Sequence, residues 1–173
     1  MVLTGSEIRR MRDAGRIVIE PFDERQVEQN SYGCCLGAEI LEYTSNQIDP
    51  HDGLNVVRHT IPEEGFVLQP GRFYLGQTAE RIGGVDFASE LYANLSTALC
   101  GMFVQTSAPL GHTGAVIYWT LEIVVTQPLR VYAGARVAKV CFWTNLGGAL
   151  KYQGRYVGSE GVVPSRIIMD QEK

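Results

Sequence analysis

The chain contains 173 residues and carries a formal net charge of −4. This length is enough for one domain with its own hydrophobic core. Hydrophobic residues make up 45% and charged residues 20%, so the composition excludes an intrinsically disordered chain. A pI of about 5.4 argues against a nucleic-acid polymer as partner, because binding to the phosphate backbone needs a basic face.

The first predicted element is a short helix that begins after Thr4 and ends at Gly15. Thr4 and Glu7 have the spacing of a capping box, in which each side chain bonds to the backbone of the other. Residues 16–20 are mostly apolar and are closed by Pro21, so they predict a first strand.

Short apolar segments separated by turn signals follow along the rest of the chain. Further strands are predicted at residues 40–43, 66–68, 73–76, 115–125, 130–132 and 136–144. Leucines recur at intervals of four between residues 89 and 99, which predicts a second short helix there. Turns at this spacing are typical of an antiparallel sandwich or barrel, so we predict one mainly β domain over residues 1–173.

Cysteine usage and hydropathy favour a cytoplasmic protein. The four cysteines show no CxxC spacing, so we expect reduced thiols. No N-terminal segment resembles a secretory signal, and no apolar run approaches the roughly 20 residues of a membrane-spanning helix. We therefore predict a cytoplasmic location and no membrane partner.

Glu122 is the strongest candidate for chemistry, because it is the only charged residue in the apolar segment 115–125. In a strand, alternation places it on one face with Tyr118 and Thr120. A carboxylate among apolar neighbours suits general acid/base catalysis. The same pattern is also explained by a strand whose polar face is exposed to solvent. From the residues alone, this second interpretation is favoured over a catalytic role.

Residues 151–161 combine glycines, tyrosines and cations. Such a segment can fold over a ligand, with backbone N–H groups and Arg155 for a phosphate and an aromatic ring for a base. Glycine-rich terminal segments are also typical of disorder or plain packing, so both interpretations stay open.

The sequence lacks the motifs of several enzyme classes. A zinc nucleobase deaminase needs HxE followed by PCxxC, and neither motif is present. His51, His59, His112 and the cysteines have no metal-ligand spacing, and Walker A, GxGxxG and GxSxG motifs are missing. We therefore expect no zinc and no other metal held by protein ligands.

A series of short motifs follows one another in a characteristic order along nearly the whole chain. They lie at Gly15 to Asp23, Asn30 to Gly37, Leu68 to Gly76, Trp119 to Glu122, Tyr152 to Tyr156 and Pro164 to Arg166. In this order they resemble the dCTP deaminase branch of the dCTP deaminase and dUTPase superfamily. The resemblance implies a distorted jelly-roll β-barrel of the dUTPase-like type with short helices. It also implies a homotrimer with active sites at subunit interfaces, in which residues 151–173 form a C-terminal tail that closes on the site.

The resemblance further implies a pyrimidine nucleotide as ligand and the zinc-independent, hydrolytic deamination of dCTP to dUTP and ammonia, with Mg²⁺ accompanying the nucleotide phosphates. Glu122 falls on the family's water-activating carboxylate, and Ser96 is expected to assist it as a second catalytic residue. The residues expected to contact the nucleotide are Asn94, Thr97, Ala108, His112, Thr120, Leu121, Tyr152, Arg155 and Ser159.

The chain departs from the family pattern where the phosphates are expected to bind. Asn94 and Leu99 stand at positions that carry arginine in the family, and His112 stands where an Asp usually contacts the sugar hydroxyl. Charged hydrogen bonds contribute about 1.5–3 kcal/mol each, so their loss predicts an altered phosphate or sugar preference.

Three functions therefore stay open. We favour a deaminase of a cytosine nucleotide. A homologue that binds a nucleotide or another protein without turnover follows closely, because a site that has lost its phosphate contacts resembles one reshaped for a smaller ligand. A dUTP diphosphatase comes last, since cleavage of dUTP to dUMP and diphosphate needs firm contacts to the triphosphate.

Overall fold

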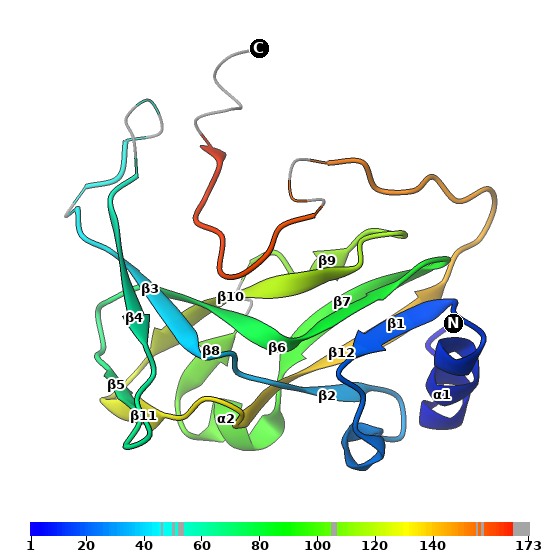
Figure 1. Cartoon of the computed structure of the whole chain (residues 1–173), viewed down its shortest axis with the longest axis horizontal. Helices are drawn as coiled ribbons and strands as arrows, with labels where there is room; N and C mark the ends of the chain where they lie inside the picture. The colour runs from blue at the N-terminus through cyan, green and yellow to red at the C-terminus, as the bar shows by residue number, and fades with distance from the viewer. Residues whose placement is uncertain are drawn as a thin grey trace.

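The computed structural model describes residues 1–45, 47–49, 51, 54–104, 107–154, 156 and 158–167. In chain order its elements are α1 (Gly5–Asp13), β1 (Ile17–Glu20), the 3₁₀ turn η1 (Glu24–Gln26), β2 (Tyr32–Cys35), β3 (Glu39–Tyr43), β4 (Val56–Thr60), β5 (Phe66–Leu68), β6 (Tyr74–Gly84), β7 (Phe87–Ala93), α2 (Leu95–Leu99), β8 (Met102–Val104), β9 (Leu110–Gly111), β10 (Ile117–Val125), β11 (Leu129–Val131) and β12 (Arg136–Thr144) (Figure 1). The prediction of a mainly β domain with short helices is confirmed.

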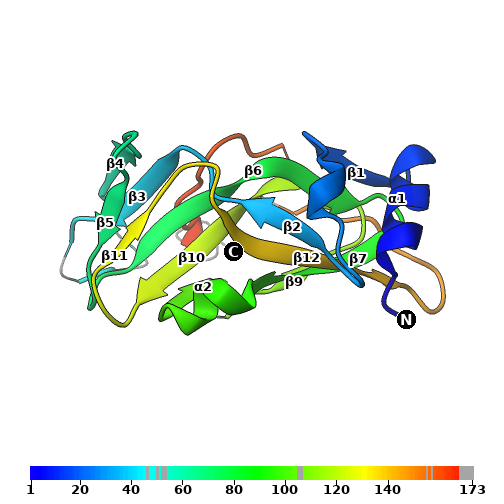
Figure 2. The same ribbon diagram turned by 90° about the horizontal axis from the view of Figure 1, so that it is seen from below.

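The strands form two main antiparallel sheets. In the larger sheet β4, β3, β6, β10 and β8 are neighbours in that order, and β1 also pairs with β6. The smaller sheet has the order β2, β12, β7, β9, while β5 and β11 pair separately. Figure 2 shows α1 at one end of the molecule and the β5–β11 pair at the other.

One hydrophobic core joins the two sheets. Ile82 and Leu121 of the larger sheet and Leu91 and Phe142 of the smaller sheet all belong to it and are fully buried. The alternation of apolar and polar residues in segment 115–125 arises because one face of this strand packs against the core.

The predicted N-terminal helix is confirmed as α1, and Thr4 begins it. The Glu7 backbone N–H donates to Thr4 Oγ1 at 3.4 Å. The Glu7 carboxylate does not complete a capping box, because it instead accepts hydrogen bonds from the Arg10 guanidinium at 2.9 and 2.6 Å. Ile8 and Met11 are buried and attach the helix to the core.

The predicted helix over residues 89–99 is wrong for most of its length. Residues 87–93 form β7, in which Leu91 points into the core and Tyr92 points outward. Only the last five residues are helical, as α2, and Leu95 and Leu99 are 71% and 78% exposed there. The leucines at intervals of four residues therefore do not form one buried helix face. Leu91 is a buried strand residue, and Leu95 and Leu99 lie on the surface of α2.

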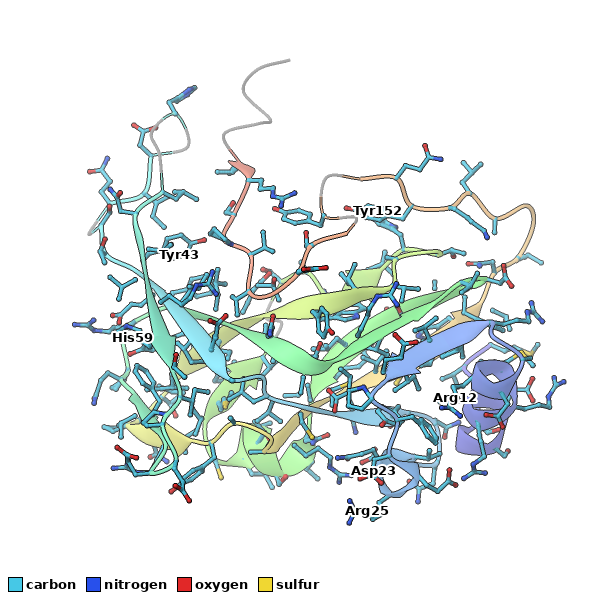
Figure 3. All side chains as sticks on the ribbon, viewed as in Figure 1. Arg12, Asp23, Arg25, Tyr43, His59 and Tyr152 are labelled. Atoms are coloured by element: carbon cyan, nitrogen blue, oxygen red, sulfur yellow. The ribbon has the colours of Figure 1, made fainter. Side chains whose placement is uncertain are left out.

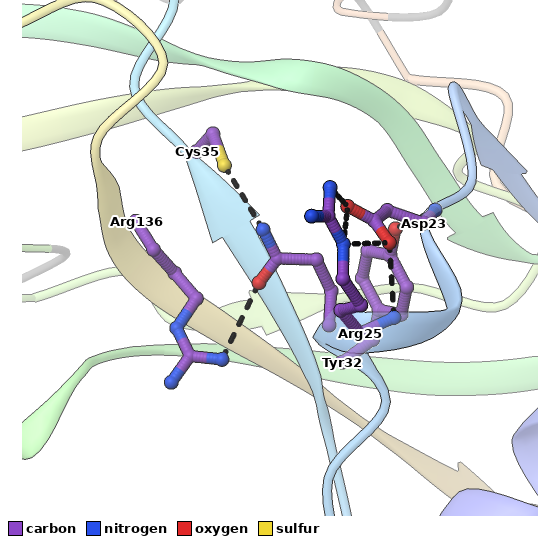
Figure 4. Close-up of polar contacts among 6 residues, drawn as sticks. Asp23, Arg25, Tyr32, Cys35 and Arg136 are labelled. Atoms are coloured by element: carbon purple, nitrogen blue, oxygen red, sulfur yellow. Dashed lines mark hydrogen bonds and ion pairs between the residues drawn. The ribbon is translucent and has the colours of Figure 1, made fainter.

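Strand β2 is held in place by polar contacts that its sequence did not predict. The Cys35 backbone N–H donates to both carboxylate oxygens of buried Glu80, at 3.1 and 3.0 Å. Gln26 donates from Nε2 to Cys35 Sγ, and Arg136 donates to Gln26 Oε1, both at 3.3 Å (Figure 4). Burial raises the pKa of Glu80 and raises the pKa of the Cys35 thiol to about 11.

All four cysteines are free of disulfide bonds, and Cys34 is fully buried. Among the residues that the structure describes, no helix is long and apolar enough to cross a membrane.

Candidate active site

A cavity of about 570 Å³ lies on the face of the larger sheet that the C-terminal tail crosses. Strand β10, the segment that leads into it from Ser107, and tail residues between Tyr152 and Ser165 all contribute to its lining. Figure 1 shows this tail, in orange and red, passing across β10 and β6. The cavity is therefore built between one sheet and a segment distant in sequence.

Strand β10 places Thr120 and Glu122 in the cavity and Leu121 in the core. Thr120 and Glu122 line the cavity, while Leu121 is fully buried. Ser107 donates from Oγ to Glu122 Oε2 at 2.9 Å. This hydrogen bond orients the carboxylate, because a charged acceptor binds a hydroxyl donor more strongly than a neutral one does.

Trp119, which also contributes to the lining of the cavity, fixes the position of this part of β10. Its backbone N–H donates to Thr78 Oγ1 at 3.0 Å, and its indole Nε1–H donates to the Ile82 carbonyl at 3.1 Å. The pairing of β10 with β6 is irregular between Tyr118 and Thr120. Trp119 therefore holds the strand at the point where its register changes, directly before Thr120.

Two aromatic side chains form one end of the cavity. His112 stacks on Tyr152 with ring centroids 5.5 Å apart and an angle of 21° between the planes. The Tyr152 backbone N–H donates to the Thr113 carbonyl at 2.8 Å. The start of the tail is thus fixed beside the turn that carries His112.

A second aromatic pair forms the other end. Tyr43 and Phe73 stack with centroids 6.3 Å apart. The Ser165 backbone N–H donates to Tyr43 Oη at 3.0 Å, so the tail is also attached at this end. Figure 3 shows Tyr43 and Tyr152 on the side of the sheet that the tail crosses, toward its two ends.

Six residues of the predicted site line this cavity. They are Ala108, His112, Thr120, Glu122, Tyr152 and Ser159. The Ser159 hydroxyl is buried and has no hydrogen-bond partner among the described residues. Because buried hydroxyl groups are normally paired, this atom suits a polar group of a ligand.

The remaining predicted residues lie elsewhere. Leu121 has its side chain in the core, so only its backbone can face a ligand. Asn94 is buried at the beginning of α2, and Ser96 and Thr97 belong to that helix; none of these three lines the cavity of its own chain. Arg155 lies outside the described residues. The roles of these residues stay predictions.

Sequence reasoning missed several cavity residues. Tyr43 lies in β3 and Phe73 directly precedes β6, and no local signal joins these two segments, because their neighbourhood depends on the fold. Ser107 has no motif around it, and its hydroxyl group close in sequence to segment 115–125 is the one signal that points to it. Tyr156 also lines the cavity, and it was not missed, because it lies in the segment 151–161 that the sequence predicts to fold over a ligand.

The described lining contains no lysine and no arginine. Its titratable groups are Glu122, His112 and tyrosines. Among the residues that the structure describes, no group of three or more His, Cys, Asp or Glu side chains could hold a metal ion. The lining therefore offers aromatic faces, hydroxyl groups and one carboxylate, which suits a planar heterocycle better than a polyanion.

The sequence profile of the dCTP deaminase-like family matches residues 2–145. A relative from Leptospira biflexa, named dCTP deaminase, dUMP-forming, is 38% identical over 174 residues, which cover 100% of this chain and 99% of the relative. Relatives of the same name from Clostridium botulinum and Cytophaga hutchinsonii are each 35% identical and are matched over 100% of both chains.

The fold is similar to that in the crystal structure of 2'-deoxycytidine 5'-triphosphate deaminase from Agrobacterium tumefaciens. The TM-score is 0.64 at 22% sequence identity, over 82% of this chain and 47% of that one. The present chain thus spans about half the length of that protein. This likeness supports the predicted dUTPase-like fold.

Proposed function

Because the chain belongs to the dCTP deaminase-like family, we propose that it hydrolyses the 4-amino group of the cytosine base of dCTP. The observation that carries the proposal is the Glu122 carboxylate, which lines a cavity between β10 and the tail and accepts a hydrogen bond from Ser107. A carboxylate held in this way can activate a water molecule beside a bound base.

In the proposed reaction Glu122 takes a proton from a water molecule whose oxygen bonds to C4 of cytosine. The same carboxyl group then transfers the proton to the 4-amino nitrogen, the C4–N bond breaks, and ammonia leaves. The proton of the new hydroxyl group on C4 moves to N3, which gives the C4 carbonyl of uracil. The aromatic faces of His112 and Tyr152 would hold the planar base in the cavity. Ser159 would donate to or accept from a polar edge of the nucleotide.

Activation of water by a carboxylate needs no zinc, and we propose a zinc-independent reaction. The absence of HxE and PCxxC motifs from the sequence supports it. Mg²⁺ enters as part of the substrate, bound to the nucleotide phosphates. Activity that persists with a zinc-selective chelator and excess Mg²⁺ is the expected result, and loss of activity that zinc alone restores would contradict it.

A second reaction is favoured by the names of the relatives, which describe dUMP as the product. In that step a water molecule attacks the α-phosphorus of dUTP, the bond to the β-phosphate oxygen breaks, and diphosphate leaves. We therefore propose dUMP rather than dUTP as the final product, which gives the diphosphatase step more weight than the sequence motifs alone did.

The test is to incubate the purified protein with dCTP and Mg²⁺ and to quantify ammonia, dUTP, dUMP and diphosphate. We expect ammonia and dUMP in equal amounts, and dUTP in place of dUMP would restrict the activity to deamination. Glu122→Gln should reduce ammonia release by about 100- to 10,000-fold while dCTP still binds, because an amide cannot accept the proton. Nucleotide binding by the native protein without ammonia would favour a non-catalytic homologue.

The position of α2 supports a homotrimer with shared sites. Asn94, Ser96 and Thr97 lie outside the cavity of their own chain, so we propose that a neighbouring subunit contributes them. Mass photometry or light scattering should give three copies per particle. Mixed particles of Glu122→Gln and Ser96→Ala subunits should regain activity, because some sites then combine an intact Glu122 with an intact Ser96. Absence of recovery from co-expressed, co-purified subunits would contradict shared sites.

A further inference from the structure

One end of the candidate active site is a thin aromatic wall, formed by the stacked rings of Tyr43 and Phe73. Both residues line the cavity that contains Glu122, and both also line a second cavity of about 730 Å³. The Phe73 side chain is 39% exposed. Because the same two rings border two cavities, close packing fixes this wall less firmly than it fixes a core side chain.

The C-terminal tail is attached to this aromatic wall. The Ser165 backbone N–H donates to Tyr43 Oη at 3.0 Å, and Ser165 itself lines the candidate active site. Hydrogen bonds weaken steeply when their distance or angle departs from the preferred values. A shift of the Tyr43 ring would therefore release this part of the tail from the site.

The register of β3 and β6 determines which side chains lie on either side of the aromatic wall. It pairs Glu42 with Tyr74. Continued by one residue, the same register places Tyr43 opposite Phe73 on one face of the sheet. Glu42 and Arg72 are then diagonal neighbours on the opposite face, where long side chains can meet. Each of these two charged residues is adjacent in sequence to one ring of the wall.

Glu42 joins three segments at this end of the larger sheet. Its side chain is only 16% exposed and forms an ion pair with the Arg72 guanidinium, directly before β6. His59 of β4 places Nε2 3.5 Å from the other carboxylate oxygen. Figure 3 shows His59 and Tyr43 at the same end of the molecule. A carboxylate that is shielded in this way is screened by salt less than an exposed one.

We propose that Glu42 and Arg72 are positioning residues of the candidate active site. Their ion pair joins the end of β3 to the start of β6, holds Tyr43 against Phe73, and so keeps the tail attached at Ser165. The inference rests on the proposed function in one respect, because it assumes that the nucleotide binds in the cavity that the tail covers.

The test replaces Arg72 with glutamine and measures hydrogen exchange of the peptide that contains Ser165, together with kcat and KM for dCTP. An ion pair of this kind is equivalent to at most about a fivefold effect, so the exchange rate and KM should both rise about three- to fivefold. The change in kcat should be less than about twofold, because the groups that meet the base stay in place. Arg72→Lys should restore part of both values, because lysine keeps a positive charge beside Glu42.

Arg136→Gln is the matched control. Arg136 pairs with Glu28 at 3.3 Å, and the Glu28 side chain is also partly shielded, at 24% exposed. This pair belongs to β12 of the smaller sheet and does not line the candidate active site, so tail exchange and KM should keep their native values. If Arg72→Gln lowers only the thermal midpoint, or behaves like Arg136→Gln in exchange and KM, the ion pair is merely structural and the proposal is wrong.

Tyr43→Phe shows whether the effect passes through the aromatic wall. This substitution keeps the ring and removes the hydroxyl group that accepts the hydrogen bond from Ser165. Once that bond is lost, Arg72→Gln should add little to the exchange rate of the tail peptide. Full additivity of the two substitutions would overturn the proposed route through Tyr43.

Hydrogen exchange needs no turnover, which separates this inference from the proposed function. Faster exchange at Ser165 in Arg72→Gln, in a protein that releases no ammonia, would support the positioning role and refute the deaminase. Ammonia release by the native protein, together with native exchange and KM in Arg72→Gln, would support the deaminase and refute the positioning role.

Discussion

Val162 gives a direct way to test how the tail is held over the cavity. Its side chain is 2% exposed and packs with Leu41 and Leu75 in a small cluster apart from the main core. Val162→Ala removes two buried methyl groups, which at about 0.8 kcal/mol per methylene equivalent weakens the anchor by about 1.5 kcal/mol. That loss corresponds to about a tenfold larger fraction of molecules with the tail detached.

Hydrogen exchange measured by mass spectrometry on tail peptides reports this fraction directly, because an amide exchanges when its segment opens. We expect exchange between residues 158 and 166 to be about tenfold faster in Val162→Ala, with the thermal midpoint of the whole protein nearly unchanged. Leu146→Ala is the control, since the Leu146 side chain is fully exposed and has no packing to lose. Equal exchange in Val162→Ala and the native protein would refute the idea that this contact holds the tail.

Three further substitutions test the core, the carboxylate partner and the buried acid. Leu121→Ala should reduce the free energy of unfolding by about 2–5 kcal/mol in urea denaturation, because it leaves a cavity in the core, whereas Thr120→Ser should change it by less than about 0.5 kcal/mol. Ser107→Ala should lower kcat/KM about three- to tenfold by removing the donor to Glu122, and an unchanged value would show that the 2.9 Å contact does not orient the carboxylate. Burial raises the pKa of Glu80 above 4.5, so its stabilising contribution is complete below that pH and is lost as the pH rises through the folded pKa. The free energy of unfolding of Glu80→Gln relative to the native protein should therefore increase between pH 4.5 and pH 8, and a difference independent of pH would contradict the burial argument.

Strands with a strong local pattern could be predicted from the sequence. The segment 136–144 has the bounds of β12, and 66–68 has those of β5. Alternation in 115–125 also placed Glu122 and Thr120 on one face, because the other face packs in the core. Strands β2 and β4 could not be found this way. β2 is fixed by Glu80 from a distant strand, and β4 is largely exposed at the sheet edge.

The candidate site was predictable where one strand or one motif carries it. Glu122 and Tyr152 belong to such motifs, and both line the cavity. The aromatic pair of Tyr43 and Phe73 depends on the neighbourhood of β3 and β6, which the sequence does not state. Residues of α2 raise a different difficulty, because the proposed contribution to a neighbouring subunit's site would leave no contact within one chain.

The register between β6 and β10 is irregular between Tyr118 and Thr120. The two halves of β10 on either side of this point should therefore differ in how well they tolerate an inserted residue. A one-residue insertion after Thr120 would exchange the faces of Leu121 and Glu122, so a core side chain would enter the cavity and a carboxylate would enter the core. An insertion before Tyr118 could extend the existing irregularity, as β-bulges commonly do. Natural insertions and deletions among related sequences should therefore gather on the N-terminal side of Trp119, and the short stretch behind it should keep a constant length.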